Sequence, residues 1–335
     1  MIRLRSISTT VVAMVALLVG APSTTGAPTY DTARVVFQPV ATHGGVFIAE
    51  KEGYFEAQRI KITWVPLNSQ DQAVPGLALS QISVGYGPTP AFFSAVSRGE
   101  WLRIVADKGH VAGRGNLASL LVRKDLAGTI KSVADLKGRR IGAPGAVGGT
   151  GHFLVARTLA SAGLTLNQVE GVFLPPATVL AALAGGAVDA ALLVNPLDTQ
   201  ALERGIGVKL VDIGDIAPGE PISFLIYGRH LLVENRALGV RFMVAYLQGV
   251  QRYIQGPTPR NVAVIAEYTK TDPEIIRKGG WVPIYADGFV DVNRARRYQD
   301  WLYEIELIGV RNPISTVIDS SFAEQARSIL GIASR

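Results

Sequence analysis

Two glycine-bearing loops hold the side chains best suited to binding an anion. Gly87 and Thr89 precede a predicted helix at 90–98, and Thr150 precedes one at 151–162. The first N–H groups of a helix are unpaired and carry partial positive charge, so such loops can hold a carboxylate, sulfonate or phosphate. The threonines would add hydroxyls, and glycine lets a ligand approach the backbone. The alternative is an ordinary turn whose threonine caps its own helix.

Three further polar positions stand at the ends of predicted strands. His43 follows the first strand and either hydrogen-bonds a ligand or caps the next helix. Asn195 ends a strand and precedes a proline, which suits a polar contact with a ligand. Tyr227 ends another strand, where an aromatic ring could stack or donate its hydroxyl. Residues 108–116 are predicted to form a loop, in which Arg114 either pairs with an anion or is solvated.

Signatures of enzymes and metal sites are missing. The 335 residues include no cysteine and only four histidines, so no thiolate site can form and a histidine-built metal site is disfavoured. The glycine run at 145–151 lacks the dinucleotide spacing, and no Walker lysine, G-x-S-x-G elbow or H-E-x-x-H motif occurs. We therefore expect no metal, no cofactor and no catalytic residue; a histidine–threonine site at His43 is the enzymatic alternative.

The composition is that of a folded domain. Hydrophobic residues make up 48% and charged residues 18%, which excludes a disordered tail and a charge-rich coiled coil. The net charge of +6 mildly favours anionic small molecules or surfaces and is too weak to indicate nucleic acid.

The N-terminal segment has the layout of a secretory signal peptide. Arg3 and Arg5 precede an apolar run at 11–19, which small residues follow. Cleavage after Ala27 is expected, with Ala21 as the rival site and an uncleaved membrane anchor as the alternative. Because no cysteine follows the apolar run, lipid anchoring is excluded, and the sequence predicts a periplasmic protein.

Strands and helices alternate in two similar halves, which predicts two α/β lobes with parallel sheets. The predicted strands are 34–38, 60–65 and 82–84 in the first half, and 140–143, 172–174 and 190–194 in the second. Two further strands, 117–122 and 223–227, are expected where the chain crosses between lobes. The expected organisation is a signal peptide at 1–27, lobe 1 at 28–120, lobe 2 at 121–222 and a return to lobe 1 at 223–335.

Helices are predicted around both halves and through most of the C-terminal part. Proline follows an N-cap aspartate at the start of one of them, which is a strong start signal. The predicted helices beyond those named above are 46–52, 72–80, 177–184, 234–255, 259–269, 273–278, 291–308 and 320–330.

Several segments, in this order and spacing, resemble the periplasmic substrate-binding proteins of ABC importers for nitrate, sulfonates, taurine and thiamine-precursor pyrimidines. The segments are GVFIAEKEGYF at 45–55, SVADLKGRRIG at 132–142, AALAGGAVDA at 181–190, VNP at 194–196 and VIDSSFA at 317–323. The likeness extends over about 34–331.

The resemblance implies a type II periplasmic-binding-protein fold, with two α/β lobes and a ligand cleft at the hinge. It also implies ligand contacts from Thr42, His43, Gly44, Ser69, Gly87, Thr89, Thr150 and Asn195, to which Tyr227 is added. The chain departs from the family pattern in two places. A loop that is often rich in serine contains Asp71, and Asn195 stands where an acidic residue is usual.

We therefore expect the solute-binding component of an ABC importer, monomeric, with a membrane permease as partner. Its ligand is expected to be an aliphatic or aromatic sulfonate or carboxylate, because Phe47, Tyr86, Phe92 and Tyr227 suggest room for an organic body. Two alternatives stay open: an enzyme on the same fold acting on a small aromatic or sulfur-containing substrate, and a ligand-sensing partner of a receptor. Family desulfinases use a cysteine nucleophile, which this chain lacks.

Overall fold

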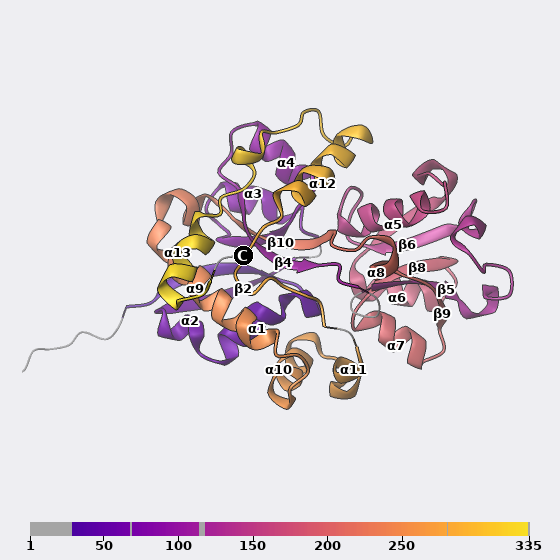
Figure 1. Cartoon of the computed structure of the whole chain (residues 1–335), viewed down its shortest axis with the longest axis horizontal. Helices are drawn as coiled ribbons and strands as arrows, with labels where there is room; N and C mark the ends of the chain where they lie inside the picture. The colour runs from indigo at the N-terminus through magenta and orange to yellow at the C-terminus, as the bar shows by residue number, and fades with distance from the viewer. Residues whose placement is uncertain (1–28, 68, 114–117, 280, 334–335) are drawn as a thin grey trace, which may run out of the picture.

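The computed structural model describes residues 29–67, 69–113, 118–279 and 281–333 and shows two α/β lobes side by side (Figure 1). The predicted signal peptide at 1–27 and the candidate Arg114 lie outside the described residues. Within those residues, none of the helices combines the length and apolar character needed to cross a bilayer.

Each lobe is built on a five-stranded sheet. The first sheet has the order β2-β1-β3-β10-β4 and the second has the order β7-β6-β8-β5-β9. The strands of the first are β1 Asp31–Phe37, β2 Ile60–Pro66, β3 Val84–Gly87, β4 Arg103–His110 and β10 Pro221–Tyr227. Those of the second are β5 Ala118–Arg123, β6 Arg140–Pro144, β7 Glu170–Leu174, β8 Ala190–Val194 and β9 Gly207–Asp212. The strand orders correspond position by position, as expected from the repeated sequence pattern.

Both sheets are mixed, so the prediction of parallel sheets is wrong for one strand in each. β10 runs antiparallel to β3 and β4, and β5 runs antiparallel to β8 and β9. These are the strands by which the chain enters each lobe from the other, so neither belongs to a strand–helix–strand unit within its own sheet.

The two crossings lie immediately before β5 and before β10. Ala118–Arg123 pairs wholly within the second sheet, and Pro221–Tyr227 pairs wholly within the first. The divisions expected after residues 120 and 222 therefore fall inside strands, because an apolar run marks a strand without showing which sheet it joins.

Thirteen α-helices are described, and most cover the two faces of the sheets. In the first lobe they are α1 Gly44–Lys51, α2 Tyr54–Ala57, α3 Ala73–Ala78, α4 Pro90–Ser97, α9 Arg236–Tyr253, α10 Pro259–Thr269, α11 Pro273–Lys278, α12 Val292–Glu304 and α13 Ser321–Leu330. In the second they are α5 Thr150–Ala160, α6 Pro176–Ala184, α7 Leu197–Glu203 and α8 Ile213–Ile216. Short helical turns occupy Ala41–His43, Lys124–Leu126, Val133–Leu136, Leu166–Gln168, His230–Glu234 and Ile314–Thr316.

The prediction of a loop at 108–116 is wrong for residues 108–110, which belong to a strand. Arg103–His110 forms β4 and pairs with β10 in the first sheet. The strand was not predicted because Asp107 and Lys108, two charged residues, interrupt its apolar pattern, yet both side chains are buried.

The two lobes touch beside the cleft through helix α12 of the first lobe. The Tyr298 and Trp301 rings contact the Phe153 ring of α5, with centroids 5.0 and 5.1 Å apart. On the other side, the Lys278 ammonium in α11 pairs with the Glu203 carboxylate in α7 at 2.7 Å. In Figure 1 these helices bridge the gap between the lobes above and below the sheets.

Candidate ligand-binding site

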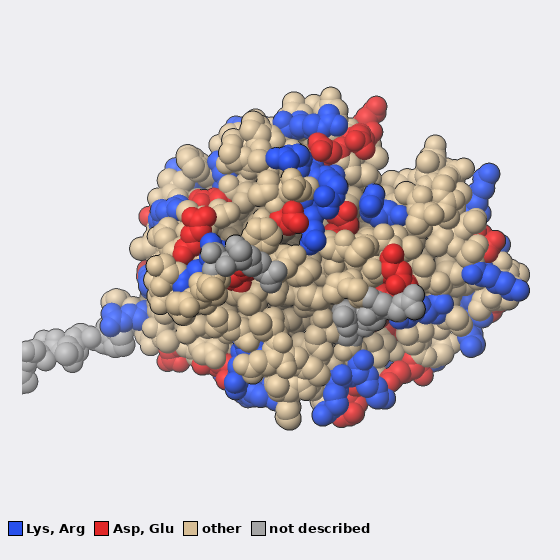
Figure 2. Space-filling view, in the orientation of Figure 1, with Lys and Arg blue, Asp and Glu red and all other residues tan. Residues whose placement is uncertain are grey.

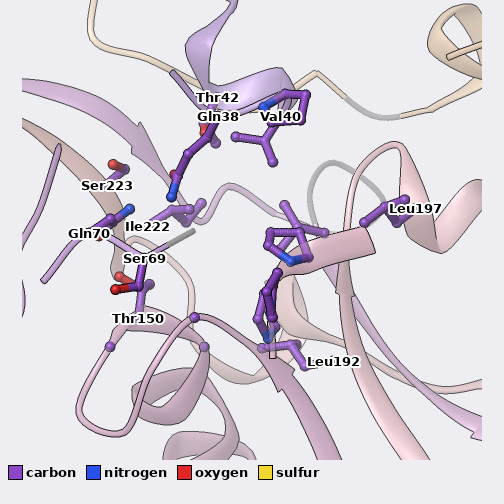
Figure 3. A pocket seen from close by; sticks show the side chains of 18 of the residues that line it. Gln38, Val40, Thr42, Ser69, Gln70, Thr150, Leu192, Leu197, Ile222 and Ser223 are labelled. Atoms are coloured by element: carbon purple, nitrogen blue, oxygen red, sulfur yellow. The ribbon is translucent and has the colours of Figure 1, made fainter. Parts of the chain in front are cut away.

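A cavity of about 370 Å³ lies between the lobes. Its walls come from the loops after β1, β2 and β3 in one lobe and after β6, β7 and β8 in the other. These are the carboxyl ends of parallel strands, where ligands of open α/β folds bind. Figure 3 shows Gln38, Val40 and Thr42 on one side of the cavity and Thr150 and Leu192 on the other. The cavity therefore has one wall from each lobe.

Five of the nine predicted contact residues line this cavity: Thr42, Ser69, Thr89, Thr150 and Asn195. They come from five different loops that follow predicted strands. Thr42 and Ser69 are implied by the family resemblance, and the other three also by the residues themselves. Their contact with a ligand stays a prediction, and the structure supplies the geometry with which it can be tested.

The structure places His43 and Gly44 outside the cavity lining. A helical turn begins at Ala41, before the predicted helix start, so His43 points into the lobe core. Its ring contacts those of Phe47 and Tyr86, with centroids 5.7 and 4.1 Å away. Gly44 instead lies against the Tyr253 ring, where a Cβ would come within 2.4 Å of a ring carbon.

Gly87 and Tyr227 also lie away from the cavity lining. A Cβ on Gly87 would meet the Ile226 side chain of the adjacent strand. The Tyr227 side chain is fully buried, and its hydroxyl donates to the Gly239 carbonyl oxygen at 2.9 Å. Because β10 is antiparallel, its first residues, among them Ser223, reach the cavity and its last residue lies at the opposite end of the sheet.

The two predicted helix N-termini differ in how they are capped. The Thr89 hydroxyl oxygen accepts from the Phe92 N–H at 3.2 Å, so this threonine caps α4 as the alternative interpretation held. The N-cap of α5 is Gly149, which has no side chain to cap the helix. Gly149 and Thr150 line the cavity, so the first turn of α5 offers it backbone N–H groups.

His152 supports the loop before α5. Its Nδ1 accepts from the Gly148 N–H at 2.9 Å, and burial lowers its pKa to about 4. The imidazole is therefore neutral near pH 7 and able to accept this hydrogen bond, which holds Gly148 in place beside the cavity.

A lysine that the sequence analysis left out stands directly behind the cavity wall. Lys108 of β4 is 1% exposed, and its Nζ donates to Thr42 Oγ1 at 3.2 Å and to Ser223 Oγ at 3.4 Å. The same Nζ lies 4.3 Å from the centroid of the Tyr86 ring. Burial lowers the pKa of Lys108 well below its usual value, and the Asp107 carboxylate offsets part of this effect.

The neighbouring hydroxyls can transmit the charge of Lys108 to the cavity. Each hydroxyl oxygen accepts from the ammonium, so the hydroxyl hydrogens of Thr42 and Ser223 are free to point elsewhere, and both residues line the cavity. The Asp107 carboxylate accepts from the Tyr285 and Gly109 N–H groups. The sequence gives one signal for a buried lysine here: Lys108 stands two residues after the apolar run 104–106. The same pattern is equally typical of a solvated strand end.

The remaining walls are aliphatic. Phe47, Tyr86, Phe92 and Tyr227, which suggested room for an organic body, are at most 2% exposed and belong to the lobe core. Apolar contact is provided instead by Val40, Leu67, Leu154, Leu192, Leu193, Leu197 and Ile222, with Pro39, Pro175 and Pro176. The cavity thus has apolar walls, although residues other than those four provide them.

Replacing His43 by leucine should flatten the acid side of the stability profile. Burial lowers the pKa of His43 well below 6.5, and Lys108 lowers it further. Below pH 6.5 the unfolded chain takes up a proton that the folded protein does not, so the wild type loses stability as the pH falls, by up to about 2 kcal/mol near pH 5. Urea unfolding at pH 7.5 and pH 5 measures the difference.

A poor fit of the leucine side chain would lower the free energy of unfolding equally at both pH values. The difference between the effects of the substitution at the two pH values therefore reports on the protonation of His43 alone. Equal losses of stability in wild type and His43→Leu would show that His43 does not contribute to acid destabilisation. The part that remains in the variant is expected to come from His152, whose pKa is also lowered by burial.

The lobes and the cavity between them define a type II periplasmic-binding-protein fold. Residues 40–259 match the family model described as NMT1/THI5 like, and the chain belongs to this family. A putative binding protein of Brucella abortus is 30% identical over 143 residues, 42% of this chain and 44% of the relative. A putative aliphatic sulfonates-binding protein of Escherichia coli is 30% identical over 208 residues, 62% of each chain. The chain thus matches less than half of the first relative's length and under two thirds of the second.

Solved structures show the same fold at low sequence identity. The alkanesulfonate-binding protein SsuA of Xanthomonas axonopodis pv. citri, bound to MOPS, aligns with a TM-score of 0.69 at 22% identity, over 87% of this chain and 99% of that one. The periplasmic nitrate-binding protein NrtA of Synechocystis PCC 6803 aligns with a TM-score of 0.75 at 16% identity, over 92% and 91%. The desulfurization enzyme DszB also aligns, with a TM-score of 0.65 at 19% identity, over 90% and 99%.

Proposed function

We propose that this protein is the solute-binding component of an ABC importer, which captures a small organic sulfonate or carboxylate between its lobes. Lys108 is the observation that carries the proposal. A buried ammonium beside two cavity hydroxyls gives an anion a source of positive charge in surroundings of low dielectric constant, where electrostatic attraction is strong.

The shape and lining of the cavity support an organic ligand over a small inorganic anion. The walls are mainly aliphatic and come from both lobes, so a ligand with a hydrocarbon body would bury it on both sides. The relative from Escherichia coli is named for aliphatic sulfonates, and the structure from Xanthomonas contains an alkanesulfonate-binding protein.

Delivery to a membrane permease in the periplasm belongs to the same proposal. Lobes that close on a ligand present a joint surface that differs from that of the open protein, which a permease can recognise. Lys and Arg alternate with Asp and Glu over the face shown in Figure 2, so that face carries no large field of one sign. This mixed charge is compatible with a protein that works as a monomer and holds a small ligand inside its cleft.

A thermal-shift screen of residues 28–335 tests the proposal. The panel contains alkyl and aryl sulfonates, aliphatic and aromatic carboxylates, nitrate and pyrimidines. A ligand at a thousandfold its Kd stabilises the protein by about 4 kcal/mol, which is about 8 °C in Tm. We expect a shift with organic sulfonates or carboxylates and none with nitrate.

Two other outcomes would contradict the proposal. A shift confined to nitrate or to pyrimidines would show that the cavity selects another class of ligand. Conversion of a bound compound, followed by mass spectrometry over several hours, would make the protein an enzyme on this fold. A protein purified after unfolding and refolding serves as the ligand-free reference.

A further inference from the structure

A tyrosine of the first lobe reaches the start of helix α5 in the second lobe. Tyr298 of α12 is fully buried, and its hydroxyl donates to the Gly148 carbonyl oxygen and hydrogen-bonds with the Thr150 side chain. The same hydroxyl lies 3.3 Å from the Pro88 carbonyl oxygen of its own lobe. Burial raises the pKa of Tyr298, so the hydroxyl keeps its proton at neutral pH and acts as a donor. Because Thr150 lines the cavity, one phenol joins the two lobes directly beside it.

Aromatic rings from both lobes fix the direction of this hydroxyl. The Tyr298 ring packs with Phe93 of α4 in its own lobe and with Phe153 of α5, with centroids 6.2 and 5.0 Å away. Trp301, one turn further along α12, packs with Tyr298 and with Phe153, at 5.7 and 5.1 Å between centroids. A close-packed group of rings leaves little room for one of them to turn. The Tyr298 hydroxyl therefore stays directed at the loop before α5.

Helix α12 also contacts the segments by which the chain crosses between the lobes. The Arg297 guanidinium pairs with the Glu220 carboxylate at 3.3 Å, and Glu220 directly precedes β10. The Glu220 carbonyl oxygen accepts from the N–H of Val111, which directly follows β4, at 2.8 Å. Both crossings thus meet beside the residue that precedes Tyr298. A rotation of the lobes about these crossings therefore moves α5 relative to α12.

The loop before α5 is held from both lobes. Within the second lobe, His152 Nδ1 accepts from the Gly148 N–H at 2.9 Å. From the first lobe, Tyr298 holds the Gly148 carbonyl oxygen and the Thr150 side chain. These two residues flank Gly149, the N-cap of the helix whose first turn offers N–H groups to the cavity. When the lobes separate, Tyr298 leaves with the first lobe, and the loop keeps only the contact with His152.

We propose that Tyr298 is a positioning residue, which orients the first turn of α5 for an anion when the lobes close. The inference rests on the proposed function and adds a residue that acts on the ligand indirectly, through Gly148 and Thr150. An anion held by backbone N–H groups needs them in a fixed direction, and hydrogen bonds on both sides of Gly149 provide it. Closure of the lobes thereby completes the binding site as well as covering it.

Calorimetric titration of Tyr298→Phe tests the inference, because phenylalanine keeps the ring contacts and removes the hydroxyl. The probe is the sulfonate or carboxylate of the thermal-shift panel that stabilises the wild type most. The variant is expected to bind this probe about 5-fold or more weakly, as expected for the loss of a buried hydrogen bond. The loss should lie in the dissociation rate, since the bond forms after the lobes close. Stopped-flow tryptophan fluorescence measures both rates.

A double-mutant cycle shows whether Tyr298 acts through the first turn of α5. Thr150→Val removes the partner hydroxyl and keeps the shape of the side chain. If the two residues act together on the probe, Tyr298→Phe costs less affinity in Thr150→Val than in the wild type. Losses of affinity that add up in the double variant would overturn the inference, and so would a loss confined to the association rate.

Tyr227→Phe is the matched control, because it removes another buried hydroxyl of the first lobe. This hydroxyl donates to the Gly239 carbonyl oxygen at 2.9 Å, within the same lobe and away from the cavity lining. Both variants should lose a similar amount of unfolding free energy, and only Tyr298→Phe should lose affinity. Equal affinities in the two variants would overturn the role of Tyr298 and leave the proposed function standing. A wild type that binds no organic anion of the panel would overturn both.

Discussion

Replacing Lys108 by methionine is expected to weaken the binding of an organic anion by about 10- to 100-fold, since a hydrogen bond to a charged group contributes about 1.5–3 kcal/mol. In the wild type the ammonium polarises the Thr42 and Ser223 hydroxyls, which line the cavity. Methionine keeps an unbranched side chain of similar length and removes the charge. Calorimetric titration of wild type and variant with the anion found in the thermal-shift screen measures the loss.

The same substitution should not destabilise the ligand-free protein. Burying an ammonium without a direct carboxylate partner is costly, so Lys108→Met is expected to leave the free energy of unfolding unchanged or to raise it. Weaker binding in a variant that is equally stable identifies a lost ligand interaction rather than a damaged fold.

The control is Lys124→Met, in which an exposed lysine of the second lobe is replaced in the same way. It should bind like the wild type, because a surface charge is screened and distant from the cavity. An affinity of Lys108→Met equal to that of the control would show that Lys108 does not compensate the charge of the ligand.

Gly148→Ala is expected to weaken ligand binding by at least about 10-fold, because it opposes the contact between the lobes and so lowers the fraction of binding-competent protein. A Cβ at Gly148 would lie 2.3 Å from Pro90 Cγ and 2.8 Å from Leu307 Cδ1, both outside the second lobe. The proline ring cannot turn away as a flexible side chain would. Small-angle scattering at saturating ligand should show a larger radius of gyration for the variant than for the wild type.

Backbone strain must be separated from this steric effect, since Gly148 has a φ of +78°. Gly163→Ala is the matched control: its φ is +72°, and a Cβ there would meet no atom within 4 Å. Both variants should lose a similar, small amount of stability, and only Gly148→Ala should lose affinity. Equal affinities in the two variants would show that the contact at Gly148 does not contribute to ligand binding.

Most helices and strands could be predicted because their signals are local. The helices α2, α7 and α8 and the strands β4 and β9 were not predicted. The predicted helix at 259–269 coincides with α10, where Thr258 caps the helix and Pro259 follows it. The predicted helix at 273–278 coincides with α11, where the Asp272 carboxylate accepts from the Glu274 N–H. A cap, a proline and an apolar period lie within a few residues of one another, so no distant contact is needed to interpret them.

The candidate site was predictable only in part. Loops that follow parallel strands lie at the same edge of a sheet, however the side chains pack. Five predicted residues from such loops line the cavity. His43 lies outside the cavity lining because a helical turn begins earlier than the sequence indicated. Tyr227 lies outside the lining because its strand runs antiparallel to its neighbours, and this direction depends on partners far away in sequence.

The sequence by itself determined the repeated α/β pattern, the family and the loops at the strand ends, because each follows from spacing along the chain. The tertiary structure alone decided which way β10 runs, and with it that Ser223 rather than Tyr227 reaches the cavity. It also decided the burial of Lys108 beside Thr42, which is 66 residues away along the chain. Long-range strand pairing produces both results, and no local pattern of residues records which strands will pair.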